Sequence, residues 1–483
     1  MRPQIVFKIL GVLLILFSTT LIPPLLFSYY NQDGVLWPFL FALALTLALG
    51  IACWLPVRRF SGDLRFRDGF LVVVLFWTVL ASVGALPLAM AKQPAMTIID
   101  ALFESMSGLT TTGATVLTGI DSLPISILYY RQQLQWLGGM GIIVLAVAVM
   151  PMLGVGGMQL YRAETPGPVK DNKLTPRITE TAKALWYIYL GLTLACALAY
   201  LAAGMHPFDA LSHAFSTVAI GGFSTHDQSL GYFNSPAVGL VATGFMVLSG
   251  FNFALHFMAL RSRRIAVYLQ DPEAVTYLLF LAGAAVLTIG VLLYSGTFAD
   301  PSDAFLNGLV QVVSVGTTTG FTTTGFYWWP SFLPVMMVIM SAVGGCAGST
   351  AGGMKIIRVL LLYKQGHREM AKLIHPNALV PIKIGGKPVS ENVINAVWGF
   401  LALYILSYVL LSLAMVGSGS DLVTAFSSVT ACLNNLGPGL GAVAENYASV
   451  SSGGKLILTF AMLLGRLELF TLLVLFTPAF WRS

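Results

Sequence analysis

Long apolar stretches alternate along the chain with short segments in which polar, charged and glycine residues gather. Each stretch holds about 20 residues, which is enough for an α-helix to cross the hydrocarbon core of a bilayer. The stretches cover residues 9–30, 37–56, 69–91, 134–159, 184–204, 235–260, 274–296, 331–361, 391–416 and 453–481. This pattern predicts an all-α polytopic membrane protein and excludes a soluble globular domain.

Four of the segments between these stretches share one pattern. Each begins with Asp, continues for the length of a short helix and ends in a loop that contains glycine. They are "DALFESMSGLTTTG" (100–113), "DALSHAFSTVAIGG" (209–222), "DAFLNGLVQVVSVGTTTG" (303–320) and "DLVTAFSSVTACLNNLG" (421–437). Such a segment is too short to cross the membrane, so we expect it to enter from one side and return. Irregular backbone at membrane depth is tolerated only where protein buries it or water reaches it.

The physical chemistry of these segments favours a binding site for cations. An Asp at a helix start accepts hydrogen bonds from free backbone N–H groups, so we expect helix N-caps at Asp100, Asp209, Asp303 and Asp421. The C-terminal end of each helix then directs partial negative charge toward the middle of the membrane. Glycine permits the backbone angles that turn carbonyl groups one way, and rings of carbonyls replace the hydration shell of a cation in selectivity filters. Close helix packing is the alternative for one Thr/Gly stretch, but four matched stretches favour a pore.

The predicted architecture therefore has four pseudo-repeats of helix, re-entrant pore helix, filter loop and helix around a central pore. Two extra N-terminal transmembrane helices precede the repeats. The predicted units are the helix pair at 1–64 and the pore repeats at 68–163, 180–264, 272–372 and 385–483. An internal repeat of this kind is stronger evidence of architecture than any single motif.

The composition is typical of a membrane protein, and the distribution of charges predicts how the chain is oriented in the membrane. Hydrophobic residues make up 57% of the chain and charged residues only 10%, against roughly 25% charged residues in soluble domains. With the N-terminus in the cytoplasm, 22 of the 26 Lys and Arg residues fall on the cytoplasmic side, as the positive-inside rule requires. Arg131 is among the three that fall outside. We therefore expect both termini in the cytoplasm, and the net charge of +6 does not indicate a nucleic-acid partner.

Several motifs resemble the superfamily of potassium transporters that includes TrkH and KtrB in bacteria and HKT in plants. They are "TTTGAT" (110–115), "AIGGFST" (219–225), "TTTGFTTTGF" (317–326), "NNLGPGLG" (434–441), "GGCAGSTAGGMKIIR" (344–358) and "GRLELFTLL" (465–473). The resemblance covers essentially the whole chain, and the two spans before the first repeat favour the TrkH branch. It implies a potassium-conducting subunit of the bacterial inner membrane, usually a homodimer, gated by a cytosolic ring of TrkA-type subunits. A nucleotide (NAD or ATP/ADP) is then expected on that partner and not on this chain, which needs no covalently bound cofactor.

The same resemblance assigns a potassium filter made of backbone carbonyls. Its residues are Thr111, Thr112, Gly113, Ile220, Gly221, Gly222, Thr318, Thr319, Gly320, Asn435, Leu436 and Gly437. In the fourth repeat Pro438 follows the glycine, and because proline fixes φ we expect this quadrant to have a different shape. Only one glycine is matched in every repeat, so we expect potassium and rubidium to be favoured over sodium by a modest margin.

The stretch at 331–361 is interrupted by small residues, and we expect a loop inside the membrane at 344–353. The 13 apolar residues 331–343 rise about 20 Å as a helix, short of the roughly 30 Å core, and the helix is expected to resume at Met354. The resemblance implies that this is a gating loop. The expected gate residues are Gly344, Gly345, Gly348, Gly352, Gly353, Lys355 and Arg466. A glycine-rich helix crossing is the alternative for the loop.

Arg466 lies in the middle of the last predicted span, so it must face protein or water. The resemblance implies that it projects under the filter and holds the gating loop. Pairing with another helix is the alternative for this side chain.

Two other functions remain to be weighed against conduction. A proton- or sodium-coupled secondary cation transporter also has broken helices and midplane sites, but it usually carries carboxylates in its spans. Glu468 is the only acid predicted mid-span, although Glu104 in a re-entrant segment leaves proton coupling open. An intramembrane enzyme needs a nucleophile with a base or a metal motif, and the six scattered histidines have no metal spacing. The chain is therefore not expected to be an enzyme.

A soluble partner would meet the basic loop 369–390 on the cytoplasmic side. The Lys and Arg residues expected at this docking surface are Arg162, Lys170, Lys173, Lys183, Lys372, Lys383 and Lys387.

Overall fold

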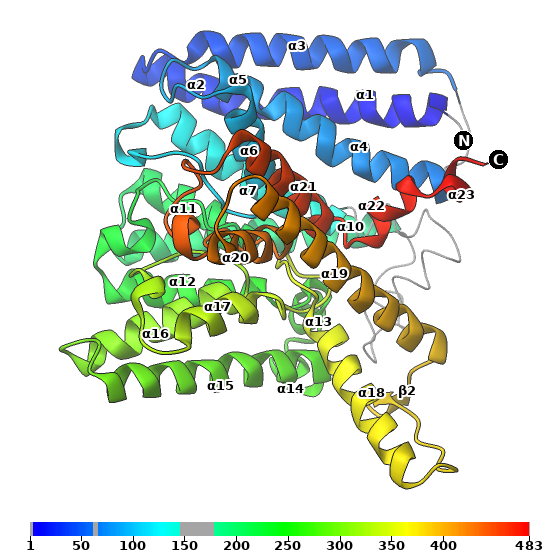
Figure 1. The fold of residues 1–483 in the computed structure, drawn as a ribbon. Coiled ribbons are helices and arrows are strands. Elements are labelled where there is room, and N and C mark those ends of the chain that lie inside the picture. Colours follow the sequence, from blue (N-terminus) through cyan, green and yellow to red (C-terminus); the bar gives the residue numbers. More distant parts are fainter. Residues whose placement is uncertain (1–2, 61–65, 145–177, 483) are drawn as a thin grey trace.

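In the computed structural model, which describes residues 3–60, 66–144 and 178–482, almost every element is a helix (Figure 1). The chain begins with α1 (Pro3–Thr20), α2 (Ile22–Asn31), α3 (Leu36–Trp54) and the short 3-10 helix η1 (Leu55–Val57). Helices α1 and α3 lie side by side because small residues let their backbones approach. A Cβ atom on Gly11 would lie 2.7 Å from the backbone nitrogen of Trp54, and one on Gly50 2.9 Å from that of Ile15.

Four similar groups of helices follow. The first holds α4 (Phe66–Gly84), α5 (Leu86–Met90), α6 (Ile98–Leu109), η2 (Ile120–Ser122) and α7 (Ile125–Val144). The second holds α10 (Ile178–Ala202), α11 (Pro207–Ala219), η4 (Ser229–Phe233), α12 (Pro236–Ser249), α13 (Phe253–Ser262) and α14 (Ala266–Gln270). The third holds α15 (Pro272–Ser295), α16 (Pro301–Gly316), η5 (Phe326–Trp328), α17 (Leu333–Ser341) and α18 (Ile356–Ile374).

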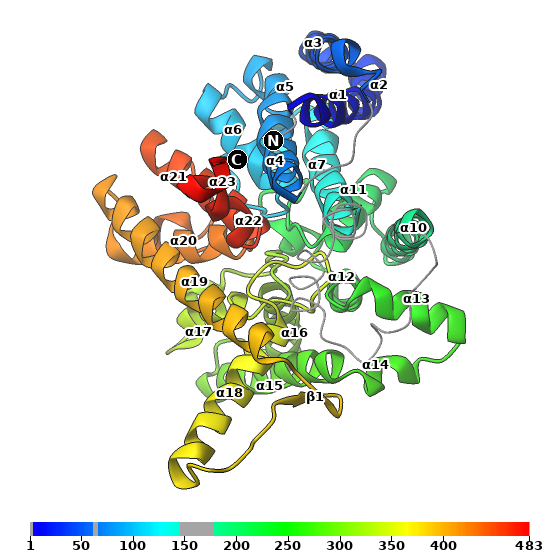
Figure 2. The ribbon, with the colours of Figure 1, turned by 90° about the vertical axis from the view of Figure 1, so that its right-hand side faces the viewer.

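A two-stranded antiparallel hairpin, β1 (Lys383–Ile384) and β2 (Lys387–Pro388), joins the third group to the fourth. The fourth group holds α19 (Glu391–Gly417), α20 (Leu422–Leu433), η6 (Gly441–Val443), α21 (Ser452–Arg466), α22 (Phe470–Leu473), η7 (Val474–Phe476) and α23 (Pro478–Trp481). Figure 2 shows the chain colours passing in order around a common axis, with α1 and α3 to one side. Each group contributes one short helix near that axis, and we call α6, α11, α16 and α20 the pore helices.

Eight of the ten predicted spans have a counterpart among the described helices. Six helices are long and apolar enough to cross a membrane, and two further helix pairs qualify if each bent pair counts as one span. The two other predictions are 331–361, which is interrupted, and 134–159, of which residues 145–159 lie outside the described residues. Arg162, Lys170 and Lys173 also lie outside them. The mostly helical, multi-span fold class is confirmed.

Two spans predicted to be continuous are bent. The pair α12 and α13 bends by 94°, and the pair Ser452–Arg466 and Phe470–Phe476 bends by 110°. At the first break Asn252 caps the new helix by accepting a hydrogen bond from Ala254 N at 2.9 Å. At the second, Glu468 and Leu469 have φ of 54° and 55°, a left-handed conformation that ends a helix. Arg466 therefore lies at the end of α21 and Glu468 in the break, and the prediction that both lie mid-helix is wrong.

The predicted N-cap is right for one pore helix and wrong for three. The residues that cap the pore helices with their side chains are Thr97, His206, Asp300 and Asp421. Asp100, Asp209 and Asp303 lie in the first helical turn instead. Two of these helices begin earlier because Pro207 and Pro301 occupy the first helical position, where the fixed φ of proline suits a helix start. An acidic residue in the first turn still interacts favourably with the helix dipole.

Candidate functional site

The four pore helices end in the same way. At each C-terminus two residues, separated by one, adopt left-handed backbone angles. The pairs are Thr111 and Gly113 (φ 51° and 79°), Ile220 and Gly222 (56° and 78°), Thr318 and Gly320 (67° and 87°), and Asn435 and Gly437 (54° and 98°). The amide between each pair donates to a carbonyl five residues back, at 2.7–2.8 Å in all four repeats. This is a Schellman-type C-cap with a non-glycine residue in a costly conformation, and four copies of it indicate a functional constraint.

No side chain fits at any of the four glycines, because each Cα packs on the loop of the next repeat. The distances from a Cβ position to a backbone carbonyl oxygen are Gly113 to Gly221 (2.2 Å), Gly222 to Thr319 (2.1 Å), Gly320 to Leu436 (2.0 Å) and Gly437 to Thr112 (2.7 Å). The contact from repeat four returns to repeat one, so the series closes. We call this arrangement of Gly113, Gly222, Gly320 and Gly437 the glycine ring.

At one matched position in all four loops, the carbonyl oxygen lacks a hydrogen-bond donor. In the described part of the chain, no donor reaches the backbone oxygens of Thr111, Ile220, Thr318 and Asn435, and all four residues are buried. A buried carbonyl without a partner costs free energy. Because the four oxygens occupy matched positions, a cation bound among them would remove this cost at all four at once.

Two of the predicted filter carbonyls do have protein donors. Gln135 donates from Nε2 to the oxygen of Gly221 at 2.5 Å, and the hydroxyl of Tyr447 donates to the oxygen of Gly437 at 2.6 Å. Both donors are buried. These side chains hold the loops from behind, and sequence patterns gave no sign of either.

The expectation that Pro438 gives the fourth quadrant a different shape is wrong for the backbone. Asn435 and Gly437 have the same left-handed pattern as their counterparts, and the same C-cap hydrogen bond closes the helix. Pro438 follows Gly437, the second left-handed residue. The C-cap needs no N–H group at this position, so proline disturbs no hydrogen bond of the cap. Its fixed φ is therefore compatible with the common loop.

A buried ion pair holds the loops of repeats one and two. Arg131 in α7 places Nε 2.8 Å from Oε1 of Glu104 in α6, and the side chains are 1% and 0% exposed. The guanidinium also donates to Ser224 O at 3.1 Å and to the Thr115 hydroxyl at 3.2 Å, while Glu104 accepts from Val116 N at 3.0 Å. The charge pattern counts Arg131 among the residues outside the spans, whereas the structure buries it within α7. A helix begins at Ile125, earlier than the apolar pattern predicts, and carries the arginine inside.

Removing one partner of this pair should be strongly destabilising. Arg131→Gln leaves the Glu104 carboxylate buried without its countercharge, and breaking a buried pair in this way costs about 3–5 kcal/mol. The double variant Glu104→Gln/Arg131→Gln should lose less than the sum of the two single variants. Unfolding in detergent, followed by circular dichroism, measures these differences.

The pair formed by Arg368 and Glu391 provides the control, since its Nη1–Oε1 distance is 2.5 Å but the carboxylate side chain is 66% exposed. Because water reaches this carboxylate, Arg368→Gln leaves no buried charge without a partner, and its loss of stability should be smaller than that of Arg131→Gln. Equal losses of stability for Arg131→Gln and Arg368→Gln would contradict the assignment.

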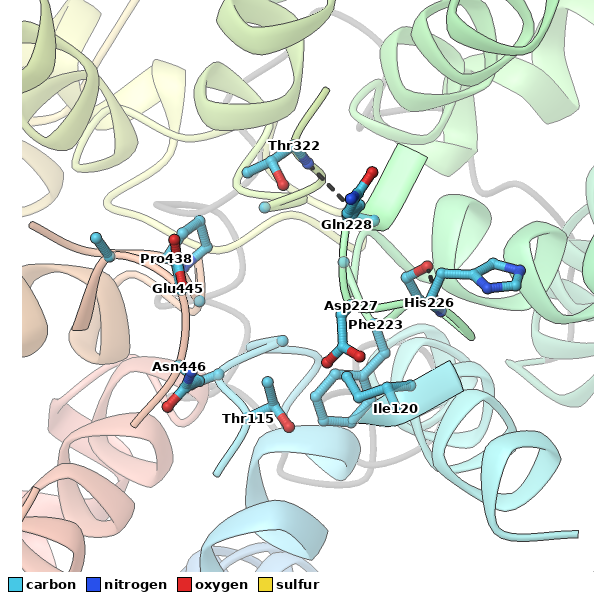
Figure 3. A pocket seen from close by; sticks show the side chains of 18 of the residues that line it. Thr115, Ile120, Phe223, His226, Asp227, Gln228, Thr322, Pro438, Glu445 and Asn446 are labelled. Carbon is cyan, nitrogen blue, oxygen red and sulfur yellow. Dashed lines mark hydrogen bonds between the residues drawn. The ribbon is translucent and has the colours of Figure 1, made fainter. Parts of the chain in front are cut away.

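A cavity of about 440 Å³ opens above the glycine ring, on the side where the pore helices begin. We call it the mouth. Figure 3 shows that Thr115, Asp227, Thr322 and Asn446 surround it, one from each repeat. Asp227 and Glu445 also give it two carboxylates. Acidic groups at a constriction raise the local concentration of cations, so the mouth favours cation entry.

A histidine joins two loops beside the mouth. His226 Nδ1 lies 2.5 Å from Oδ1 of Asp121, and its Nε2 lies 3.5 Å from Oδ1 of Asp209. Burial acts to raise the pKa of Asp121, but the hydrogen bonds with His226 and from the amide of Asp227 outweigh it, so this pKa lies below its ordinary value. The carboxylate therefore stays charged at neutral pH and adds to the negative potential of the mouth.

The loop between α17 and α18 lies against the ends of three pore helices. Its contacts are Cys346 N to Gly250 O (2.9 Å), Ala347 N to Glu273 Oε1 (2.6 Å), the Thr350 hydroxyl to Val218 O (3.1 Å), Gly352 N to the Thr318 hydroxyl (2.7 Å) and Gly353 N to Asn434 O (3.1 Å). The loop thus lies across the C-terminal ends of these helices, on the side opposite the mouth. An irregular loop is observed where it was predicted, but α18 begins at Ile356 and not at Met354.

The predicted gate glycines all lie in this loop and serve its tight course. Gly344, Gly348 and Gly353 have left-handed φ of 70–73°. A Cβ atom on Gly352 would lie 1.9 Å from the carbonyl oxygen of Asn434. Gly345 is equally restricted, since its Cβ position is 2.7 Å from the side chain of Ala351. The loop therefore fits its place only with small residues.

Two cationic side chains also contact the loop. Arg466 donates from Nη1 to the carbonyl oxygen of Thr350 at 3.2 Å, and within the described residues its Nε and Nη2 have no partner. Lys355 is buried and donates from Nζ to the carbonyl oxygen of Ala351. Glu468 forms an ion pair with Arg358 at 2.5 Å. The structure brings all the predicted gate residues together, and it adds Glu273, which sequence analysis missed.

These features define a class of protein: a polytopic membrane protein with four re-entrant loops around one axis. The comparisons agree. The model of the TrkH family, described as cation transport protein, matches residues 38–483. The chain is 55% identical to the Trk system potassium uptake protein TrkH of Halomonas elongata, over all of both chains, and 54% identical to that of Escherichia coli K12, over 99% of each. The crystal structure of the potassium transporter TrkH from Vibrio parahaemolyticus matches over all of both chains, with a TM-score of 0.93 and 51% identity.

The chain therefore belongs to the TrkH family of cation transport proteins. As a member of this family with several membrane-crossing helices, it is a multi-pass membrane transporter. The names of its relatives describe transport proteins, in agreement with the expectation from the sequence.

Proposed function

We propose that this protein takes up potassium across the bacterial inner membrane, through a central pore whose selectivity filter is formed by the four loops. The observation that carries the proposal is the set of four matched, buried carbonyl oxygens without donors, at Thr111, Ile220, Thr318 and Asn435. Carbonyl oxygens are the ligands that potassium filters use. The names of the relatives, which describe potassium uptake, support potassium as the ion.

The filter is proposed to bind a dehydrated ion among backbone oxygens of the twelve residues assigned above. Closure of the glycine ring fixes the distance between neighbouring loops, because each glycine is in contact with the next repeat. A ring that cannot contract holds a larger ion more favourably than a smaller one. Since only one such ring is built, a modest preference for potassium over sodium follows.

The loop at 344–353 is proposed to be the gate, with Arg466 holding it in place. It is continuous with α18, which projects from the bundle (Figure 1). A cytosolic partner that binds α18 or the β1–β2 hairpin would be able to pull the loop from its seat. We propose a TrkA-type nucleotide-binding subunit as this partner, a homodimer as the assembly, and cytoplasmic N- and C-termini. The nucleotide belongs to the partner, and the potassium ion is the only ligand assigned to this chain.

Coupled transport is the second candidate, because several carboxylates are buried in the bundle, Glu104 and Glu273 among them. Glu104 is paired with Arg131, whereas Glu273 is 7% exposed and accepts from Ala347 N. A carboxylate that takes up a proton is the usual basis of coupling. Because Arg131 already neutralises the charge of Glu104, this carboxylate is a poor proton carrier. The ion pair therefore favours conduction over proton coupling.

Reversal potentials in a reconstituted bilayer distinguish the two candidates. With potassium and proton gradients set separately, we expect the reversal potential to follow the potassium gradient and to ignore the proton gradient. A reversal potential that shifts with the proton gradient would replace conduction with coupled transport. Absence of potassium-dependent current from folded protein with an opened gate would overturn both candidates.

A further inference from the structure

The bend between α12 and α13 creates a surface helix at the end of the bundle opposite the mouth. Helix α12 begins just after the mouth-lining loop and ends at Ser249, and α13 then leaves it at 94°. Helix α12 has 14 residues and does not cross the membrane alone, but it runs along the bundle beside α16, so the 94° bend turns α13 toward the membrane plane. Leu260 and Ile265, at the end of this helix and just after it, are exposed. A helix of this kind lies at the boundary between headgroups and acyl chains.

A groove of about 700 Å³ separates this surface helix from α10. Its apolar lining comes from both sides and includes Tyr187, Ile188, Leu192, Leu260, Ile265 and Tyr268. Gly191 widens the groove, because no atom of the described residues lies within 4 Å of its Cβ position. The groove is therefore a slot of the size of a ligand site, apolar along most of its length.

Two arginines complete the lining of this groove. Arg263 is the C-cap of α13, with a left-handed φ of 53°, and Arg264 follows it. In the described part of the chain, neither guanidinium has a carboxylate within salt-bridge distance. Adjacent arginines beside an apolar slot repel one another unless an anion lies between them. Guanidinium groups bind phosphate oxygens through paired N–H donors.

We propose that this groove binds one anionic phospholipid of the cytoplasmic leaflet. The phosphodiester lies against Arg263 and Arg264, and the upper part of an acyl chain lies in the slot between α10 and α13. Basic pockets between transmembrane helices on the cytoplasmic side recognise such headgroups. Charge complementarity favours an anionic over a zwitterionic lipid, and the apolar length of the groove favours a lipid over a free phosphate.

Native mass spectrometry of the full chain in detergent, titrated with phosphatidylglycerol or phosphatidylcholine, tests this proposal. We expect one phosphatidylglycerol to be retained per chain at concentrations where phosphatidylcholine is not. Arg263→Gln/Arg264→Gln should weaken phosphatidylglycerol binding at least about tenfold, equivalent to ~1.4 kcal/mol. The control is Arg58→Gln/Arg59→Gln, an exposed arginine pair that lies outside the groove, and it should bind as the parent does.

A second variant tests the slot itself. Gly191→Leu places a side chain in the groove from a Cβ position that has no described atom within 4 Å, and it should reduce lipid retention while both arginines remain. Gly283→Leu is its control, because nothing lies within 4 Å of that Cβ position either and the residue is outside the groove. Each variant is first shown to melt at the parent's temperature.

Four results would overturn the proposal. Equal retention of the two lipids, or unchanged retention in both groove variants, would remove the lipid site. Competition by glycerophosphoglycerol, which has the headgroup without acyl chains, would indicate a site for free phosphate esters. Loss of partner binding with unchanged lipid retention in the arginine variant would assign the arginines to a protein interface.

Discussion

Gly222→Ser should remove the preference for potassium over sodium while the protein remains folded. The new Cβ atom would lie 2.1 Å from the carbonyl oxygen of Thr319 and 3.1 Å from the backbone of Gly320. Neither is the end of a flexible side chain, so the loop of repeat three must move. The left-handed φ of 78° adds strain of about 1–3 kcal/mol for a residue with a side chain. Because the glycine ring is closed, a shift at one contact changes the spacing around it.

The measurement is the relative permeability to potassium and sodium in a reconstituted bilayer, made for Gly113→Ser, Gly320→Ser and Gly437→Ser as well. Gly437→Ser should have the mildest effect, since its Cβ position is 2.7 Å from the nearest oxygen. Gly296→Ser is the control, with a φ of 62° but nothing within 4 Å. Unchanged relative permeability in all four ring variants would remove the filter from these loops, and an equal change in the control would attribute the effect to backbone strain.

The sequence predicts the architecture well because one feature of it is repeated. Four segments that run from Asp to Gly can occupy equivalent positions only around a shared axis, and the structure has them there. The positions of the four ring glycines could be predicted for the same reason. What the repeat does not reveal is the order of contact, in which each glycine meets the next repeat and the fourth returns to the first.

Local signals were present for some of the errors. Pro207 and Pro301 mark the starts of two pore helices, and a Thr three residues before Asp100 forms a capping pattern with it. These signals predict the N-caps of three pore helices correctly, whereas the Asp common to the four segments does not. The first left-handed residue of each loop carries no such signal, because residues as different as Thr, Ile and Asn stand at this position.

Other features depend on tertiary contacts that no local pattern records. Arg131 and Glu104 are separated by 27 residues, and the ion pair permits both charges to lie where an apolar pattern would exclude them. The bend at Gly250 follows from packing, since the hydroxyl of Tyr277 occupies the place of a Cβ atom at 2.1 Å. The carboxylate of Glu273 reaches the loop at 344–353 from a helix start. Such partners are distant in sequence and are found only once the helices are assembled.

Deleting residues 345–351 should raise resting potassium flux and leave the potassium preference intact. The deletion removes the hydrogen bonds of the loop to Gly250, Glu273 and Val218, so the closed position loses three of its supports. It leaves the glycine ring untouched. A gate has two arrangements of similar free energy, and a partner biases them only through its different affinity for each. With the closed arrangement weakened, flux should depend less on the cytosolic partner.

Arg466→Ala provides a milder form of the same test and keeps the loop at full length. It removes the donor to the carbonyl of Thr350 and a positive charge beside the proposed conduction path, so flux should rise, by less than in the deletion. Arg261→Ala is the control, since that arginine is exposed and lies outside the loop contacts. Tracer uptake into vesicles, with and without the partner, measures both effects. A loop that only braces the bundle would give lower flux in both variants, with lower thermal stability. A loop that gates the pore would give higher flux, with the glycine ring still selecting potassium. The proposed filter and the proposed gate are built from different residues, and the loop contacts the filter region through hydrogen bonds to Thr318 and Asn434.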